Sequence, residues 1–367
     1  MRALVLLIAL AATARADDTA VVGAAIGAGG QGDATYGAVE ARLDAEYAGA
    51  HIGLGARLVW DGGVLRRGDW DRPGDLVTLL RYLEYASGPL AIAAGGLAPS
   101  HLAHVADGYR ATLDDRLRTG ARAQLADERG SLELEIDDVL DPVLVGGSAA
   151  WQLAPAWRIH TATAVDPSGA HVESAIELGI ARTWRQRGAE AAAGAAIDGE
   201  PGLGASVAGF ASAAVDRGGL RWSGAAELRG GTGTDGAAFG PLYRIERLTH
   251  GGRMDLYDLA RAGRTSGVGA ALTLGVAGLP GWLEVGVRAR PGLGTLGMLS
   301  GGAPMGRKVQ LGGWLAASPY DAAGAAELRV AWARRLYSAL QVARMVRFDM
   351  DPAAVWSVVA WFGATTE

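Results

Sequence analysis

The sequence has 367 residues, enough for one large domain or two of ordinary size, and its 50% hydrophobic content excludes a generally disordered chain. Its 56 glycines show no G-X-Y repeat and accompany only 13 prolines, which excludes a collagen-like chain and indicates frequent turns or close backbone packing. The absence of cysteine excludes a disulfide framework, and a net charge of −5 without a basic patch argues against a nucleic-acid partner.

The N-terminal segment has the layout of a secretory signal peptide. Arg2 precedes the apolar stretch Ala3 to Ala12, and Ala14-Arg15-Ala16 forms a small-x-small processing site. We therefore predict a signal peptide over residues 1–16 and an exported domain over 17–367. A buried first helix is the weaker alternative. After residue 16 no uncharged run reaches the roughly 18 residues that a spanning helix needs, so membrane crossing would have to use strands.

The first strands of the predicted series form a hairpin. Residues 36–47 alternate apolar and charged side chains, although Val39, Leu43 and Tyr47 also fit one face of a helix. We favour a strand because the alternation is unbroken and leads past Gly49 into another alternating run over 52–60. Residues 61–74 are charged and rich in turn residues, so we expect a long loop there.

Later segments repeat this alternation, and we expect 16 to 20 strands in an even number. The further strands are predicted over 76–85, 90–94, 117–125, 132–137, 143–153, 157–165, 172–181, 189–197, 203–215, 220–229, 268–276, 282–290, 309–316, 327–332, 340–348 and 355–362. Long loops are expected over 97–115 and 292–306, and residues 230–266 allow no firm prediction.

The clearest alternation lies in 282–290, where Leu283, Val285 and Val287 alternate with polar or small residues. A helix would scatter the charges of Glu284 and Arg288 around its axis. About nine residues is also the length that a tilted strand needs to cross a bilayer.

Alternation occurs in soluble sandwiches as well, and three features favour a membrane barrel. The strands continue without the break in composition that separates soluble β domains of about 100 residues. Glu and Arg occur together on the polar face. Tryptophans lie near predicted strand ends, as an interfacial girdle would place them: Trp60, Trp157, Trp184, Trp222, Trp282 and Trp356. The predicted fold class is all-β, a single closed antiparallel transmembrane β-barrel of about 16–20 strands.

The polar face of such a barrel would line a lumen too wide for side chains to fill. The predicted lumen-lining residues are Glu40, Arg42, Arg57, Arg118, Arg122, Glu133, Glu135, Arg158, Glu177, Arg229, Glu284, Arg288 and Arg329. Mixed charges predict a passive channel for small polar solutes with weak selectivity, and the loop over 97–115 is the candidate to fold inward and narrow it.

The chain resembles the porin-like outer-membrane β-barrels of Gram-negative bacteria. The resemblance rests on the signal peptide, the alternating strands of about ten residues, the short turns between longer loops and the lack of cysteine. It implies an outer-membrane location, with membrane lipid, lipopolysaccharide and the assembly machinery as partners, and it leaves the oligomeric state open. One departure is the C-terminus, where Phe362 is followed by Gly363 to Glu367 instead of ending the chain.

Two motifs have weaker functional interpretations. Residues Gly27 to Gly32 match G-x-G-x-x-G, but without a following βαβ unit we expect a turn and no nucleotide site. His101 and His104, near Asp107 and Tyr109, could ligate a metal, yet their spacing does not supply a full ligand set. We expect exposed loop residues and no metal or cofactor.

Glu133, Glu135 and Asp137 are expected to point the same way along one strand, where they could form an acid or cation site. Arg118 and Arg122 on the neighbouring strand are more plausible as partners that neutralise them.

Two other classes of function remain as alternatives. An outer-membrane hydrolase would need a clustered catalytic set, such as His101 or His250 with an acidic partner, and no G-x-S-x-G motif is present. An exported structural or adhesive β protein would place the same alternating faces in a soluble sandwich.

Overall fold

The structure, a computed structural model, describes residues 19–31, 34–47, 50–61, 64–65, 72–97, 100–102, 105–109, 118–167, 173–200, 204–232, 242–243, 266–278, 281–290, 294–333, 336–347 and 355–366. The predicted signal peptide, residues 1–16, lies outside these ranges. Within them, no helix is both long enough and apolar enough to cross a membrane.

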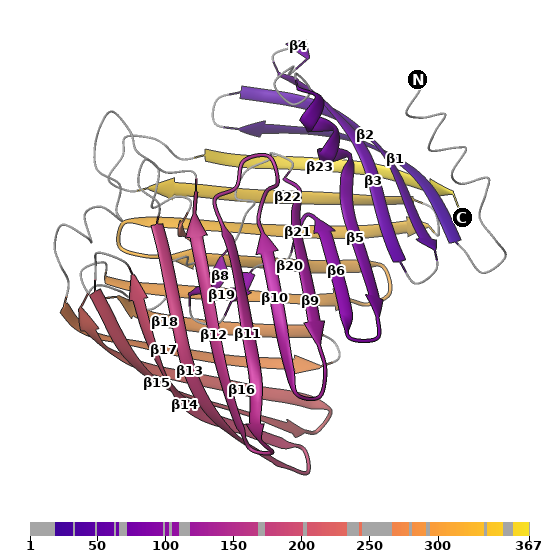
Figure 1. Ribbon diagram of the computed structural model, residues 1–367. Coiled ribbons are helices and arrows are strands. Elements are labelled where there is room, and N and C mark those ends of the chain that lie inside the picture. The colour runs from indigo at the N-terminus through magenta and orange to yellow at the C-terminus, as the bar shows by residue number, and fades with distance from the viewer. Residues whose placement is uncertain are drawn as a thin grey trace.

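Most of the described chain forms one closed antiparallel sheet (Figure 1). Twenty strands pair in succession, and the last pairs with the first. They are β1 (Thr19–Gln31), β2 (Ala34–Tyr47), β3 (Ala50–Asp61), β5 (Leu80–Ser87), β6 (Leu90–Gly95), β9 (Gly120–Ala126), β10 (Gly130–Ile136), β11 (Val145–Ala154), β12 (Trp157–Asp166), β13 (Glu173–Gln186), β14 (Ala189–Glu200), β15 (Gly204–Arg217), β16 (Leu220–Thr232), β17 (Ser266–Gly278), β18 (Gly281–Arg290), β19 (Gly294–Met305), β20 (Val309–Ala317), β21 (Asp321–Ala333), β22 (Leu336–Arg347) and β23 (Val355–Thr366). The predicted closed antiparallel barrel of 16–20 strands is confirmed.

The register explains how the sheet begins and closes. Tyr47 lies opposite Ala50, which confirms the hairpin predicted from the alternation on either side of Gly49. At the seam, β1 and β23 are antiparallel, with Ile26 opposite Phe362. Closure leaves no unpaired sheet edge among these strands.

The two rims of the barrel differ in the length of their connections. At one rim, called here the short-turn rim, successive strands are joined by two or three residues, as at 88–89, 127–129, 155–156 and 218–219. The start of β1 and the end of β23 lie at this rim as well. The opposite rim, the long-loop rim, carries all of the longer connections, among them 96–119 and 233–265.

The wall has an apolar outer face and an inner face of small and polar residues. On β13, Ile176 and Leu178 have exposed fractions of 52% and 60%, whereas the alternating Glu177 and Gly179 are buried. Successive residues of a strand point to opposite faces, so the large exposed side chains face outward and the buried set faces the interior.

Many glycines face the interior because an aromatic ring lies directly opposite on the neighbouring strand. A Cβ atom on Gly27 would lie 2.7 Å from the ring of Trp361, closer than van der Waals contact allows. The same arrangement recurs in register, and the pairs are Gly27 with Trp361, Gly53 with Tyr82, Gly179 with His160, Gly194 with Phe210, and Gly363 with Tyr337. Part of the high glycine content therefore serves cross-strand packing.

Three predicted element assignments were wrong. Gly27 to Gln31 belongs to β1 and not to a turn, and Gly27 makes room for the inward ring of Trp361. Residues 294–305, expected in a loop, form β19, which pairs along its length with β18 and β20. The predicted strand over 76–85 begins as a 3-10 helix, η2 (Pro73–Leu79), where Pro73 cannot donate a ladder hydrogen bond. A two-residue strand, β4 (Val64–Leu65), pairs antiparallel with the end of β3.

Candidate functional site

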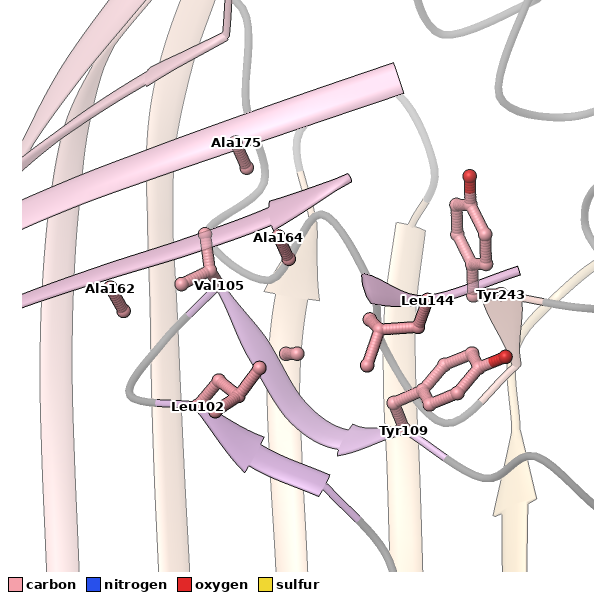
Figure 2. Close-up of a cluster of buried hydrophobic side chains, with 9 residues drawn as sticks. Leu102, Val105, Tyr109, Leu144, Ala162, Ala164, Ala175 and Tyr243 are labelled. Atoms are coloured by element: carbon pink, nitrogen blue, oxygen red, sulfur yellow. The ribbon is translucent and has the colours of Figure 1, made fainter. Parts of the chain in front are cut away.

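The interior of the barrel holds a hairpin from the connection between β6 and β9. Strands β7 (Ser100–Leu102) and β8 (Ala106–Tyr109) pair with each other in a separate two-stranded sheet. Leu102 and Ala106 are fully buried in a cluster with alanines of β12 and β13. Figure 2 shows Leu102 beside these alanines. Those alanines, Ala162, Ala164 and Ala175, alternate with the outward-facing residues of their strands. The described part of the loop over 97–115 therefore folds into the barrel.

Two buried tyrosines, one in the hairpin and one packed against it, bind carboxylates at the long-loop rim. The hydroxyl of Tyr109 donates a 2.5 Å hydrogen bond to Asp137, and the hydroxyl of Tyr243 donates a 2.9 Å bond to Asp166. The two rings meet edge to face with centroids 6.3 Å apart (Figure 2). Asp137 also accepts hydrogen bonds from the backbone N–H groups of Val143 and Leu144. The tyrosine hydroxyls and the carboxylates are buried, so their pairing fixes the hairpin in one position.

Residues 242–243, from the long connection between β16 and β17, contact two parts of the wall. Tyr243 packs in the hairpin cluster against β12 and β13, whereas Leu242 packs against Leu296, Ala316 and Ala323 of β19, β20 and β21. Strands β12 and β19 are far apart in the order of the sheet. This dipeptide therefore joins the inward hairpin to a distant segment of the wall.

The inner face next to the hairpin carries a compact charge cluster. Arg122 on β9 donates to Glu135 on β10 over 2.8 Å, and its guanidinium also lies 3.3 Å from Glu133. The carboxylate of Glu135 is almost wholly buried, whereas Arg122 keeps about a fifth of its side-chain surface. The predicted neutralisation of these glutamates by Arg122 is confirmed by these contacts.

A second cluster lies near the seam, where Glu40 on β2 is only 3% exposed. Its carboxylate is 4.0 Å from Arg57 and 3.4 Å from Arg81, a residue that the sequence did not single out. The guanidinium of Arg57 also lies 4.8 Å from the centre of the Trp361 ring. Burial of a carboxylate is tolerable here because two cations share it.

Further pairs continue around the interior. His160 lies 2.6 Å from the fully buried carboxylate of Glu177, and Arg229 binds Glu227 at 2.9 Å and the hydroxyl of Ser206. On β21, the guanidinium of Arg329 lies 3.5 Å from the carboxylate of Glu327, and both side chains are more exposed than the other pairs.

The remaining predicted residues are more scattered. Arg158 donates to Ser131 near the short-turn rim, Glu284 is exposed, and Arg288 is 6% exposed. The backbone of Arg42 lies in β2, but its side chain is outside the described set.

The acidic cluster predicted on one strand is divided by the end of β10. Glu133 and Glu135 lie in the strand, whereas Asp137 follows it and accepts a hydrogen bond from Tyr109. Arg118 precedes β9, which begins only at Gly120, and its guanidinium pairs with Asp138 at 3.2 Å.

Asp138 lies in the connection between β10 and β11, outside the strands, and is 5% exposed. Burial raises the pKa of its carboxyl above the ordinary value, while a hydrogen bond from the Leu140 backbone and the charge of Arg118 act in the opposite direction. Desolvation is the largest of these effects.

The described residues form neither the metal site considered at His101 and His104 nor the catalytic set considered at His101 or His250. His101 lies in β7 opposite Asp107, but neither side chain is described, and His104 and His250 lie outside the described ranges. Among the residues that the structure places, no group of three His, Cys, Asp or Glu side chains could hold a metal. From the sequence, Tyr109 was considered only as a neighbour of these histidines. Tyr243 and Asp166 could not be predicted as partners, because 77 residues separate them along the chain.

Comparison with known proteins gives matches to solved structures alone. No family model matches the chain, and no curated protein matches it. The outer membrane protein OpdK from Pseudomonas aeruginosa aligns with a TM-score of 0.41 and 9% identity, over 95% of this chain and 99% of that one. OccK9 (OpdG) from Pseudomonas aeruginosa gives 0.41 and 12%, over 95% and 98%. A BenF-like porin from Pseudomonas fluorescens Pf-5 gives 0.43 and 9%, over 96% and 99%. These values are too low to place the chain in the family of any of these proteins.

Proposed function

We propose that this protein is an outer-membrane β-barrel that acts as a passive channel for small polar solutes. The contrast between its two faces carries the proposal: large apolar side chains are exposed on the outside, while ion pairs occupy the inside. A soluble barrel would gain nothing from an apolar outer surface of this extent. In lipid, a closed sheet satisfies every backbone hydrogen bond between its strands.

The rims support a bacterial outer-membrane orientation. Short turns and both ends of the sheet at one rim, with longer loops at the other, are typical of outer-membrane barrels, whose short turns face the periplasm. Exposed outward tryptophans gather near the short-turn rim, as expected for an interfacial girdle: Trp151, Trp157, Trp184, Trp222 and Trp332.

The proposed path runs along the charged inner face. Barrels of 16 to 18 strands already leave an aqueous channel, so twenty strands leave room for solutes unless loops fill it. The inward hairpin β7–β8 and residues 242–243 are the proposed constriction. We assign the lumen to the residues expected from the sequence, Glu40, Arg42, Arg57, Arg118, Arg122, Glu133, Glu135, Arg158, Glu177, Arg229, Glu284, Arg288 and Arg329. Because both signs of charge occur in pairs, the channel would discriminate weakly between ions.

The first test is fractionation of cells that express the full chain, followed by gel migration with and without boiling. We expect recovery in the outer membrane and heat-modifiable migration, and the mass of the purified protein tests cleavage after Ala16. Recovery in a soluble fraction would reject the membrane barrel.

The second test is single-channel recording in planar bilayers. A variant lacking residues 100–109 should conduct more current than the wild type, because the hairpin no longer occupies the interior. Asp127→Ala, in an exposed turn at the short-turn rim, is the control and should leave conductance unchanged. Equal conductance with and without the hairpin would remove it from the path.

A further inference from the structure

The outward face of the barrel carries very few charges. In the described strands, the alternation places only three charged residues on this face, and all three are arginines: Arg182 on β13, Arg217 at the end of β15, and Arg344 on β22. No acidic residue of these strands shares the face. A cation on a surface that is otherwise apolar needs an anionic partner or water.

Arg182 is held between two aromatic rings near the short-turn rim. Its guanidinium carbon lies 5.7 Å from the ring centre of Trp157 and 5.2 Å from that of Trp184. Trp157 is its direct cross-strand neighbour, and on the other side it faces Ala193, which offers no functional group. Among the described residues Arg182 has no acidic partner, so its planar N–H donors can take an oxyanion from outside the chain.

An apolar groove lies beside this arginine on the same outer face. It has a volume of about 410 Å³, and its lining includes Leu125, Leu132, Ala149, Trp151, Ile159 and Leu178. Ile159 lies two residues from Trp157, and Leu178 lies four residues from Arg182. At about 3.3 Å per residue, these two residues lie roughly 7 and 13 Å along their strands from Trp157 and Arg182, toward the middle of the wall. Pro89 and Asp127 extend the lining of the groove to the short-turn rim.

We propose that this part of the wall binds one membrane glycerophospholipid, with its phosphodiester on Arg182 between Trp157 and Trp184 and an acyl chain in the groove. This inference rests on the proposed membrane location. The guanidinium supplies paired donors to the phosphate oxygens, and the two indole rings keep it in place. Ile159 and Leu178 place part of the groove on the membrane side of the arginine, where a chain attached to that headgroup can lie. Charge and shape therefore select the same ligand.

The test measures retention of phosphatidylglycerol by the full-length barrel in detergent micelles, using native mass spectrometry. Arg182→Gln should weaken binding at least about tenfold, the loss expected when a charge-assisted contact of about 1.4 kcal/mol is removed. Arg344→Gln, which removes another outward arginine at the opposite rim, is the matched control and should bind like the wild type. Heat-modifiable migration shows that each variant is folded. Equal retention by both variants would overturn the site.

A second pair of variants tests the groove. Ala149→Phe places a ring among the groove residues and should reduce phosphatidylglycerol retention severalfold, whereas Ala211→Phe, on the outer face of β15, should not. Inorganic phosphate at millimolar concentration should not displace the lipid. Full displacement would show a site for free anions and overturn the lipid assignment. Loss of lipid binding by a barrel that is still recovered in the membrane rejects this inference alone, whereas soluble recovery rejects the proposed function with it.

Discussion

The hydroxyl of Tyr109 donates a 2.5 Å hydrogen bond to the buried carboxylate of Asp137, which links the inward hairpin to the connection after β10. Tyr109→Phe removes this donor and keeps the ring. A charge-assisted bond contributes about 1.5–3 kcal/mol, so we expect the temperature at which heat-modifiable migration is lost to fall. We also expect more frequent excursions to higher conductance in single-channel recordings, because the hairpin is held less firmly.

The matched control for this variant is Tyr320→Phe, which changes a partly exposed tyrosine in the connection between β20 and β21. It should change neither property. If Tyr109→Phe had the same thermal stability and the same frequency of high-conductance excursions as this control, the hydrogen bond would not be what positions the hairpin.

The cluster of Arg122 with Glu133 and Glu135 predicts a change in ion selectivity. Arg122→Ala removes the cation and leaves two carboxylates on the inner face. The lumen then becomes more negative, so the reversal potential in a potassium chloride gradient should shift toward cation selectivity. Because Glu135 is nearly buried, the variant should also lose about 3–5 kcal/mol of stability.

Arg185→Ala provides the comparison, since Arg185 is exposed near the short-turn rim and its pair with Glu190 is screened by water. Its reversal potential should match that of the wild type. An Arg122→Ala channel with an unchanged reversal potential would place this cluster away from the ion path.

The barrel itself could be predicted from the sequence because period-two alternation is a local property. The run over 282–290 reads directly as a strand with one apolar face, and β18 has those properties. Strand prediction failed where glycines replaced the alternating apolar and polar side chains. Residues 294–305 looked like a loop, although the glycines of β19 pair normally once strands lie on both sides.

The interior could be predicted only in part. Arg122 and Glu135 lie on adjacent strands joined by a short turn, so their pairing follows from local register. Tyr243 and Asp166 meet only because a long connection returns into the barrel, and no spacing in the sequence encodes that contact. Arg81 was missed for a related reason: it lies at a register irregularity between β3 and β5, where alternation no longer gives the face.

The seam between β1 and β23 depends on Trp361, whose ring is buried with Ala38, Val59 and Ala339. Trp361→Ala should cost about 3–5 kcal/mol through loss of the ring and the cavity that it leaves. Gly27→Ala should also destabilise the barrel, because its new Cβ atom would lie 2.7 Å from that ring. Gly37→Ala on β2, where a Cβ atom meets nothing within 4 Å, is the control and should be tolerated. Equal thermal stability of the two alanine variants would contradict the packing role of Gly27.

Asp138 should make stability depend on pH in a defined direction. Burial raises its pKa above 3.8, so the folded state favours the protonated carboxyl. Its contribution to stability is fully present below pH 3.8 and is lost as the pH rises through the folded-state pKa. Asp138→Asn cannot ionise, and its thermal midpoint should therefore rise relative to that of the wild type as the pH increases through that range.

Asp127 gives the opposite sign within the same protein. Hydrogen bonds from the backbones of Arg129 and Gly130 lower the pKa of this exposed turn carboxyl below 3.8, so its contribution is present above pH 3.8 and lost as the pH falls through the folded-state pKa. The midpoint of Asp127→Asn should therefore approach that of the wild type on acidification below pH 3.8. Both carboxyls lie in connections outside the strands, so burial in the membrane does not cause either pKa shift. Parallel pH profiles for the two variants would show that neither local environment controls the titration.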